Sequence, residues 1–481
     1  MLSAFDKPAR VAGELRFHGV VFLLCIVVKA ALVALDDRVR LFMGDSATYL
    51  WSAATLHVPT DRSYSYPLFI RAITAPFGSI DALLWAQALC GAATATMTAW
   101  LLRDVFDVRR CVAICAALVV CLDPMQLFYE RMVMTESLST CALIASVCVA
   151  VAYIRNGRAS LLAACIGLGL VSVSLRTGLA PLSLCLGAAI VLLRWDRLNR
   201  TQVLRHLAIA VSLTWSSHFA YQHLYGWATH AGPAYIRDGG LFRLGLVAPL
   251  VRAEDFEGTR VDAHVLDEVT IPLADERMRE AQIWSSGGLI DVLKRNAGSR
   301  AYKSASKIAT HAMRRDPLGV IKLGIATTAD YFDDGLRHAR LVSDLGAGQL
   351  PDERTLTLLR DSFAYDASGV ARTPSPMYRY FEFTPWWPTA CLFALAPLSL
   401  VAAFARARRN RAALLQLLVS CGLVVGQVLC AHIVSFRYLH PFTVLMTLNA
   451  AVVVDAAVAF VAKRRAHNEA PAVQPVEAMA T

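Results

Sequence analysis

Acidic, basic and aromatic side chains gather in one polar stretch, residues 42–71, between two strongly apolar segments. Asp45 stands near its start, Tyr49 follows one helical turn later, and Arg62 and Tyr66 come towards its end. A carboxylate can take a proton from a hydroxyl group, and a guanidinium group binds phosphate through a planar fork of donors. Because loops carried by a rigid scaffold often hold binding and catalytic groups, we expect the chemistry of an enzyme at this stretch.

Two further carboxylates lie at the ends of apolar segments. Glu136 opens one of them and Asp123 precedes a proline. Each acid also has a simpler interpretation: Asp45 as a helix N-cap, Glu136 as a first-turn acid favoured by the helix dipole, and Asp123 as the end of a helix. Glu130, beside an arginine, is read as half of a solvated pair. The sequence leaves these alternatives open.

Two arginines lie in short turns that connect apolar segments. Arg176 stands in Leu-Arg-Thr-Gly, and Arg437 stands in Phe-Arg-Tyr-Leu-His. Both could extend towards lipid headgroups, or both could bind a phosphate, with Arg62 as a third candidate. Tyr49, Tyr66 and His440 are the candidates for lining a sugar or acceptor site.

The elements that must position these groups are predicted to be membrane helices. The chain has 481 residues, 56% of them hydrophobic and 17% charged. The apolar residues form blocks of about 20 residues, the length that spans a bilayer as a helix. We therefore predict an all-α multi-span membrane protein with about ten transmembrane helices. The blocks begin and end near residues 17–35, 80–102, 110–128, 135–154, 159–175, 178–194, 204–221, 386–405, 412–433 and 439–462.

Composition narrows the functional classes further. A net charge of +10 suggests nucleic acid binding in a soluble protein, but here the arginines cluster in short loops between apolar blocks, so we expect no nucleic acid partner. All 12 cysteines fall in apolar blocks and are interpreted as packing residues. Lys29, near the end of the first block, is expected to extend its ammonium group to the interface.

Loop charge predicts the orientation, because cytoplasmic loops carry the excess of Lys and Arg. The arginine-rich loops near residues 103–110, 155–158, 194–205, 406–411 and 463–465 fall on one side. Both termini are then cytoplasmic in an inner (plasma) membrane. We expect an N-terminal transmembrane module with the catalytic first loop at 1–221, an outward, periplasmic, mainly helical region at 222–384, C-terminal transmembrane helices at 385–465 and a disordered tail at 466–481. The outward region thus lies between spans seven and eight, and its apolar stretch 318–328 is expected to be an interfacial or packed helix.

Five motifs, in order along the whole chain, resemble those of one family. They are Gly44-Asp45-x-x-x-Tyr49, Tyr66-Pro67-Leu-Phe, Thr135-Glu136-Ser-Leu, Leu175-Arg176-Thr-Gly and Phe436-Arg437-Tyr438-x-x-Pro441. The chain is similar to the polyprenyl-phosphate-sugar-dependent glycosyltransferases of the GT-C superfamily, which include protein mannosyltransferases and lipid A aminoarabinose transferases.

The resemblance implies a GT-C-like fold and a glycosyltransferase that takes a sugar from a polyprenyl-phosphate donor on the outer face. It assigns the acid acting on the acceptor to Asp45, a second acid to Glu136, with Asp123 as the other candidate, and phosphate contacts to Arg176 and Arg437. The acceptor is left open between a lipid, a glycan and a protein. A divalent metal ion is the one cofactor left open; Ser46 stands where many members carry a second acid, so no ligand set is assigned.

Two other functional classes remain. A transporter or flippase of lipid-linked glycans should show polar groups at the bilayer midplane and broken helices. The spans here are mostly apolar, with ionisable groups near their outward ends. A polysaccharide polymerase or ligase would share the lipid-linked donor and the large outer loop. It would place its essential groups in the long loop rather than in the first one.

Overall fold

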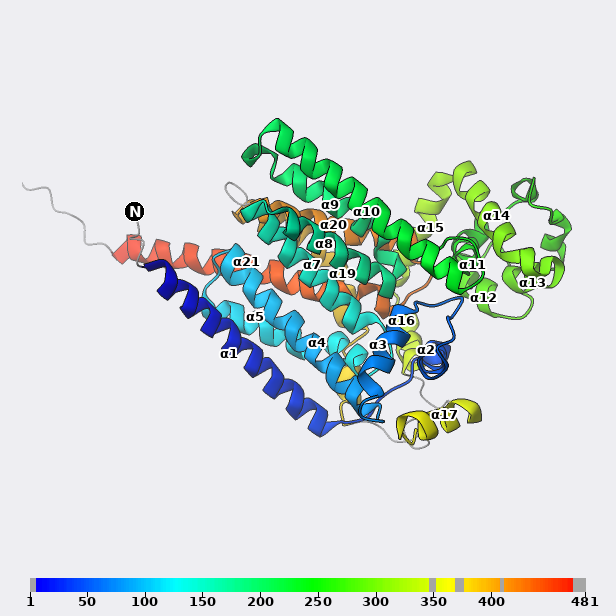
Figure 1. Ribbon diagram of the computed structural model, residues 1–481, viewed down its shortest axis with the longest axis horizontal. Coiled ribbons are helices and arrows are strands. Elements are labelled where there is room, and N and C mark those ends of the chain that lie inside the picture. Colours follow the sequence, from blue (N-terminus) through cyan, green and yellow to red (C-terminus); the bar gives the residue numbers. More distant parts are fainter. Residues whose placement is uncertain (1–5, 346–351, 368–375, 407–410, 470–481) are drawn as a thin grey trace, which may run out of the picture.

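The structure is a computed structural model that describes residues 6–345, 352–367, 376–406 and 411–469, and in these ranges every regular element is a helix apart from one isolated bridge. Figure 1 shows an elongated bundle in which the start of α1 and the end of α21 lie at one end and α2, α3 and α11–α17 lie at the other. The all-α class is thus confirmed for the described residues. Most of the predicted disordered tail, and Arg408 and Arg409, lie outside them.

Ten longer helices build the bundle. Small side chains let them approach closely, as on α4, where Ala88, Ala92, Ala95 and Ala99 form one buried stripe. The helices are α1 (Asp6–Leu35), α4 (Asp81–Trp100), α5 (Arg110–Leu122), α7 (Glu136–Asn156), α8 (Ala159–Leu175), α9 (Ala180–Leu193), α10 (Arg200–Ala228), α19 (Trp386–Arg406), α20 (Arg411–Cys430) and α21 (Phe436–Glu469).

Fewer helices than the sequence predicted combine the length and the apolar composition needed to cross a membrane. In the described part of the chain, five helices are long and apolar enough to span a bilayer: Gly13–Leu35, Glu136–Asn156, Arg379–Ala405, Arg411–Cys430 and Phe436–Arg465. The helices α4, α8, α9 and α10 occur where blocks were predicted, but they do not meet this criterion. A membrane protein is therefore supported, and the count of ten spans stays a prediction.

The predicted third span is broken into two helices. α5 and α6 (Pro124–Glu130) meet at an angle of 48°, so together they make a sixth candidate span. Asp123 between them has φ −52° and ψ 125°, outside the helical region. The cause is Pro124, which lacks an N–H group and disfavours helical geometry in the residue before it.

Short elements at one end of the bundle carry the polar first loop. α2 (Met43–Thr55) and α3 (Ser65–Thr74) are joined by that loop. The chain before α2 pairs with the connection before α7: the Arg40 N–H donates to Arg131 O at 2.7 Å, and the Val133 N–H donates to Arg40 O at 3.0 Å. This two-bond bridge holds the start of α2 beside the start of α7, the helix that Glu136 opens.

Residues 222–384 contribute to two hydrophobic cores. A second core holds buried residues from Leu241 to Val320, on α11 (Gly239–Val247), α13 (Leu289–Ala297), α14 (Ala301–Arg315) and the start of α15 (Pro317–Asp330). Further along, Leu341 and Leu359 belong to the main core, so α16 (Asp334–Asp344) and α17 (Glu353–Phe363) pack with the bundle. The predicted domain boundaries stay predictions.

The stretch 318–328 forms α15, a helix packed against α20. The two helices approach so closely that a Cβ on Gly324 would lie 1.7 Å from the Val428 carbonyl oxygen. The packed helix predicted there is confirmed.

The other helical elements are α12 (Arg279–Trp284), α18 (Tyr378–Phe381), the π-helical η1 (Leu101–Val105) and the 3-10 segments η2 (Thr177–Leu179), η3 (Trp195–Arg197), η4 (Ala248–Leu250), η5 (Ala253–Phe256), η6 (Ala263–Glu268), η7 (Glu276–Met278) and η8 (Gly298–Arg300).

Candidate functional site

Asp45 lies in the first turn of α2, and its carboxylate is held by two guanidinium groups. Arg62 Nη2 donates to Oδ1, and Arg437 Nη1 donates to Oδ2 at 2.8 Å. The N-cap of α2 is Phe42, whose side chain caps nothing, and its backbone N–H donates to Ser46 Oγ at 2.7 Å. The carboxylate of Asp45 therefore faces charged groups from distant parts of the chain and does not serve as the helix cap.

Arg437 connects Asp45 to the second predicted acid. It lies in the first turn of α21, and its Nε donates to Glu136 Oε1 at 2.9 Å. Glu136 is fully buried, and the Asp45 side chain is 10% exposed. We call Asp45, Arg62, Glu136 and Arg437 the acid–arginine cluster. Charge-assisted bonds of this kind are strong and directional, so the cluster fixes both carboxylates relative to one another.

Arg176 lies near this cluster but has no ion pair within the described residues. Its Nη1 is buried without a hydrogen-bond partner, and the guanidinium carbon lies 5.7 Å from the centre of the Tyr438 ring. Glu136 and Arg437 are the two charges that act on it most strongly. A half-buried guanidinium with donors to spare is suited to an incoming anion.

One acid of the site was missed by the sequence analysis. Asp344 ends α16 and is fully buried, and its Oδ1 lies 2.9 Å from Arg340 Nε. Burial raises the pKa of its carboxyl to about 7, and the charges acting on it include Arg437 and Asp45. Arg340 also contacts Glu280 of α12 at 3.1 Å. In the sequence, Arg340 and Asp344 show the i,i+4 spacing of an exposed helix pair, which gave no sign of burial.

The three predicted lining residues are all buried. Tyr49 and Tyr66 meet edge to face, with ring centroids 5.0 Å apart, and the Tyr66 hydroxyl donates to Gln87 Oε1 at 2.6 Å. His440 lies deeper: its Nε2 is 2.8 Å from Gln126 Oε1, and its Nδ1 is 3.0 Å from Thr140 Oγ1. Tyr49 is near Asp45, whereas Tyr66 and His440 support the surrounding helices.

Asp123 is not brought to the acid–arginine cluster. It is the N-cap of α6, where its Oδ2 accepts from the Gln126 N–H at 3.0 Å and from Thr443 Oγ1 at 2.8 Å. The geometry matches the simpler interpretation of this residue, a carboxylate at a helix boundary.

The carboxylates of the cluster do not fit a metal site. Both oxygens of Asp45 and one of Glu136 accept bonds from guanidinium groups, which cannot be ligands. Among the described residues, the one group that could hold an ion is Glu14, His18 and Asp104. Glu14 there is already paired with Arg103 and Arg110.

No family model matches the chain, and no curated protein is similar to it at a significant level. Two solved structures of ArnT from Cupriavidus metallidurans show a distant likeness. The structure bound to undecaprenyl phosphate is 14% identical with a TM-score of 0.34, covering 95% of this chain and 81% of that chain. The apo structure is 15% identical with a TM-score of 0.30, covering 92% and 78%. At these values the likeness carries no argument about this chain.

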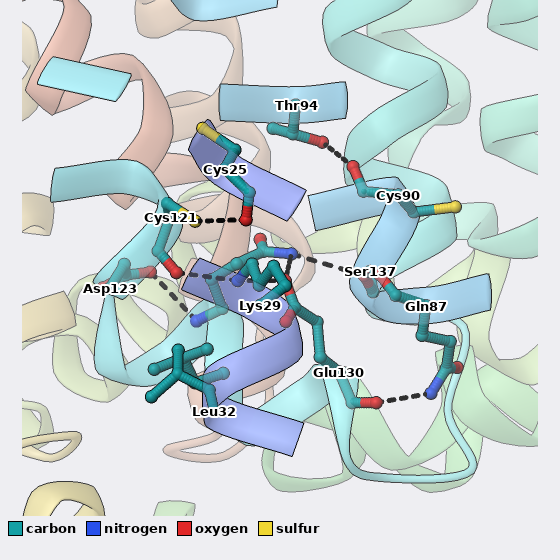
Figure 2. Close-up of polar contacts among 12 residues, drawn as sticks. Cys25, Lys29, Leu32, Gln87, Cys90, Thr94, Cys121, Asp123, Glu130 and Ser137 are labelled. Atoms are coloured by element: carbon teal, nitrogen blue, oxygen red, sulfur yellow. Dashed lines mark hydrogen bonds and ion pairs between the residues drawn. The ribbon is translucent and has the colours of Figure 1, made fainter. Parts of the chain in front are cut away.

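A buried ion pair links the first helix to α6, shown in Figure 2. Lys29 Nζ lies 2.8 Å from Glu130 Oε1 and donates to Cys121 O at 2.7 Å, and the two side chains are 3% and 1% exposed. The predictions of an interfacial Lys29 and of a solvated Glu130–Arg131 pair are therefore wrong. Arg131 is also buried and donates to Leu32 O at 2.8 Å.

Glycine makes room for this pair. A Cβ on Gly91 would lie 1.7 Å from Glu130 Oε1, so the carboxylate fills the space that a side chain would take on α4. Gln126 Nε2 also donates to Glu130 Oε1 at 2.8 Å, and Gln126 in turn bonds His440. A continuous chain of polar side chains thus runs from α1 to α21, the helix that carries Arg437.

Proposed function

We propose that this protein is an integral membrane glycosyltransferase that moves a sugar from a polyprenyl-phosphate donor to an acceptor hydroxyl at the outer face of an inner membrane, with both termini cytoplasmic. The observation that carries the proposal is the sharing of Arg437 between Asp45 and Glu136 at one end of a bundle of membrane-length helices. A polyprenyl tail explains why the enzyme is embedded in the bilayer. The resemblance of the five motifs adds to this reading.

The proposed reaction is an attack by the acceptor oxygen on the anomeric carbon of the donor sugar. The bond from that carbon to the phosphate oxygen breaks, and its electron pair leaves with the phosphate. Such a transfer passes through an oxocarbenium-like state, so it needs a base for the acceptor proton and positive charge around the departing phosphate. Asp45 takes the proton, and Arg176 and Arg437 bind the phosphate.

The contacts of Asp45 imply an order of events. Both its oxygens are bonded to guanidinium groups, so opening one of these contacts exposes a carboxylate oxygen to the acceptor hydroxyl. The donor phosphate is a phosphodiester with one negative charge and two free oxygens, so it can accept from a guanidinium fork as a carboxylate does and competes for Arg437. Arg176, which holds no carboxylate in the described part of the chain, anchors that phosphate. Donor binding then releases the base, while Glu136 keeps Arg437 in place through Nε.

A flippase for a lipid-linked glycan is the second candidate, because two observations favour it. The Lys29–Glu130 pair is an ionisable pair buried between the membrane-length helix α1 and the end of α6, and α5 and α6 together form a bent candidate span. Both features are expected of transporters. A polymerase or ligase is less favoured, because the first loop supplies Asp45 and Arg62.

A reconstitution experiment separates the first two candidates. Purified protein in liposomes receives polyprenyl-phosphate sugars of defined sugar type together with a membrane lipid and glycan extract as acceptor. The glycosyltransferase releases free polyprenyl phosphate and labels the acceptor. Movement of intact donor between leaflets without phosphate release would assign the chain to the flippases.

A further inference from the structure

Trp284 is an exposed aromatic side chain that contacts the acid–arginine cluster and has no part in the reaction described above. It ends α12, and 53% of its surface is exposed. The Arg62 guanidinium carbon lies 5.5 Å from the centre of its ring, within the range of a cation–π contact. The same guanidinium group donates to Asp45 Oδ1. One arginine side chain thus joins the indole ring to the proposed base.

Contacts between the first loop and the start of α11 hold this ring in place. The Asp238 N–H donates to Thr60 O at 3.0 Å, and Thr60 Oγ1 donates to Asp238 Oδ2 at 3.2 Å. On α11, which begins at the next residue, Phe242 meets Trp284 edge to face, with ring centroids 5.6 Å apart. Figure 1 shows α2, α11 and α12 at the same end of the molecule. The loop that carries Arg62 is therefore bonded to the helices that position the indole ring.

The place of Trp284 in the fold differs from that of the tryptophans that are more exposed. Lipid or its headgroups can cover those indole rings, because they lie on or beside the bundle helices α9, α10 and α19: Trp195, Trp215, Trp227 and Trp386. Trp284 instead lies on α12, which packs on α11 and α13 of the second core, and its ring contacts a residue of the candidate site. An exposed ring at that position is open to a ligand of the site.

We propose that Trp284 binds the sugar of the donor by packing its ring against the C–H face of a pyranose. The inference rests on the proposed function and names a group that recognises its donor. The phosphate takes Arg437 at one oxygen of Asp45, whereas Arg62 and the indole ring lie at the other oxygen. The anomeric carbon must come within reach of the acceptor oxygen at Asp45, so the sugar extends from the phosphate towards Arg62.

The chemistry of this wall suits a sugar. Aromatic side chains are common in ligand sites, and an indole ring offers a large apolar face on which the C–H groups of a pyranose can pack. Arg62 Nε is buried and bonds none of the described residues, so it retains a donor for a sugar hydroxyl. The ring and the guanidinium group together offer one apolar and one polar contact to the same ligand.

The test measures lipid binding by the full chain in nanodiscs for wild type, Trp284→Ala, Trp284→Phe and Trp227→Ala. The probes are bare polyprenyl phosphate and polyprenyl phosphate carrying glucose, galactose or mannose. Trp284→Ala should lower the affinity for the sugar-bearing lipid that wild type binds best by about 10-fold and leave the affinity for the bare lipid unchanged. Trp284→Phe keeps an aromatic face and should retain most of the affinity. Trp227→Ala, which removes a 79% exposed ring on α10, should behave as wild type.

The outcomes separate the inference from the proposed function. An equal loss for both kinds of lipid in Trp284→Ala would show that the ring only positions Arg62, and it overturns the inference, as does an unchanged affinity for both. A Trp284→Ala protein that needs more acceptor extract for half-maximal transfer, with unchanged donor affinity, places the ring at the acceptor and also overturns it. If the loss depends on the sugar but wild type transfers no sugar from any donor, the proposed function fails while Trp284 stays a sugar-binding residue.

Discussion

Arg437 Nη1 lies 2.8 Å from Asp45 Oδ2, although the two residues are 392 positions apart in the chain. The arginine proposed to bind the donor phosphate therefore also restrains the proposed base. Donor binding and base release are then one event, which would limit proton transfer in the absence of donor.

Two replacements of Arg437 test separately how its charge and its planar fork of donors contribute to phosphate binding. Arg437→Ala should weaken polyprenyl phosphate binding more than Arg437→Lys, because lysine keeps the charge but loses the fork that bridges Asp45 and Glu136. Affinity in detergent is the measurement. Arg411→Ala is the control, since Arg411 is exposed and pairs with Asp196. Unchanged affinity in Arg437→Ala would move the phosphate role to other residues.

The buried pair in the bundle predicts a stability effect. Lys29→Met leaves Glu130 without its ammonium partner and should cost about 3–5 kcal/mol of unfolding free energy. Adding Glu130→Gln removes the stranded charge and should recover most of this loss. Thermal unfolding in one detergent measures both variants. If Lys29→Met alone melts like wild type, the pair contributes nothing to the fold.

A substitution at Gly91 tests the packing around the same Lys29–Glu130 pair. Gly91→Ala places a methyl group 1.7 Å from Glu130 Oε1 and should displace the carboxylate, with a clear drop in melting temperature. Gly167→Ala on α8 is the matched control, because nothing lies within 4 Å of its Cβ position. The alanine at 167 should be neutral or slightly stabilising. Equal melting of the two variants would show that α4 and α6 can move apart freely.

The sequence located the candidate site residues and the helices that carry them better than it predicted which side chains are buried around them. Block length located α7 and α21, and positions at the block ends together with the resemblance of the motifs selected Asp45, Glu136, Arg176 and Arg437. It could not reveal which charged groups are buried, because burial depends on packing partners far along the chain. Lys29 is matched by Glu130 only through the space at Gly91.

Asp344 was missed for a related reason. Its helix has the alternation of charged and apolar residues that is typical of a solvated surface. Its burial comes from packing that the helix pattern does not show: Leu341 lies in the main core, and Tyr331, before the start of α16, donates to Ser435 O. Similarly, the sequence predicts one block over 110–128, with a helix end at Asp123 as the simpler interpretation of that acid, and the structure bends this segment by 48° at Pro124.

The predicted topology has its own test. A reporter active only outside the cytoplasm should be active when fused near Asp45, Thr135, Gly178 or Asp255, and silent near Arg109, Asn156 or Arg409. The arginine-rich loops motivate this pattern. Activity at Arg409 would refute the arrangement with ten spans.

The most direct measurement is the turnover of a lipid-linked sugar donor by wild type and Asp45→Asn at equal amounts of folded protein. Asparagine keeps the size of the side chain but cannot take the acceptor proton, so turnover should fall by about 10²–10⁴-fold. Asp81→Asn, an exposed first-turn acid on α4, should stay near wild type. Near-equal rates of wild type and Asp45→Asn would contradict the assignment of Asp45 as the base.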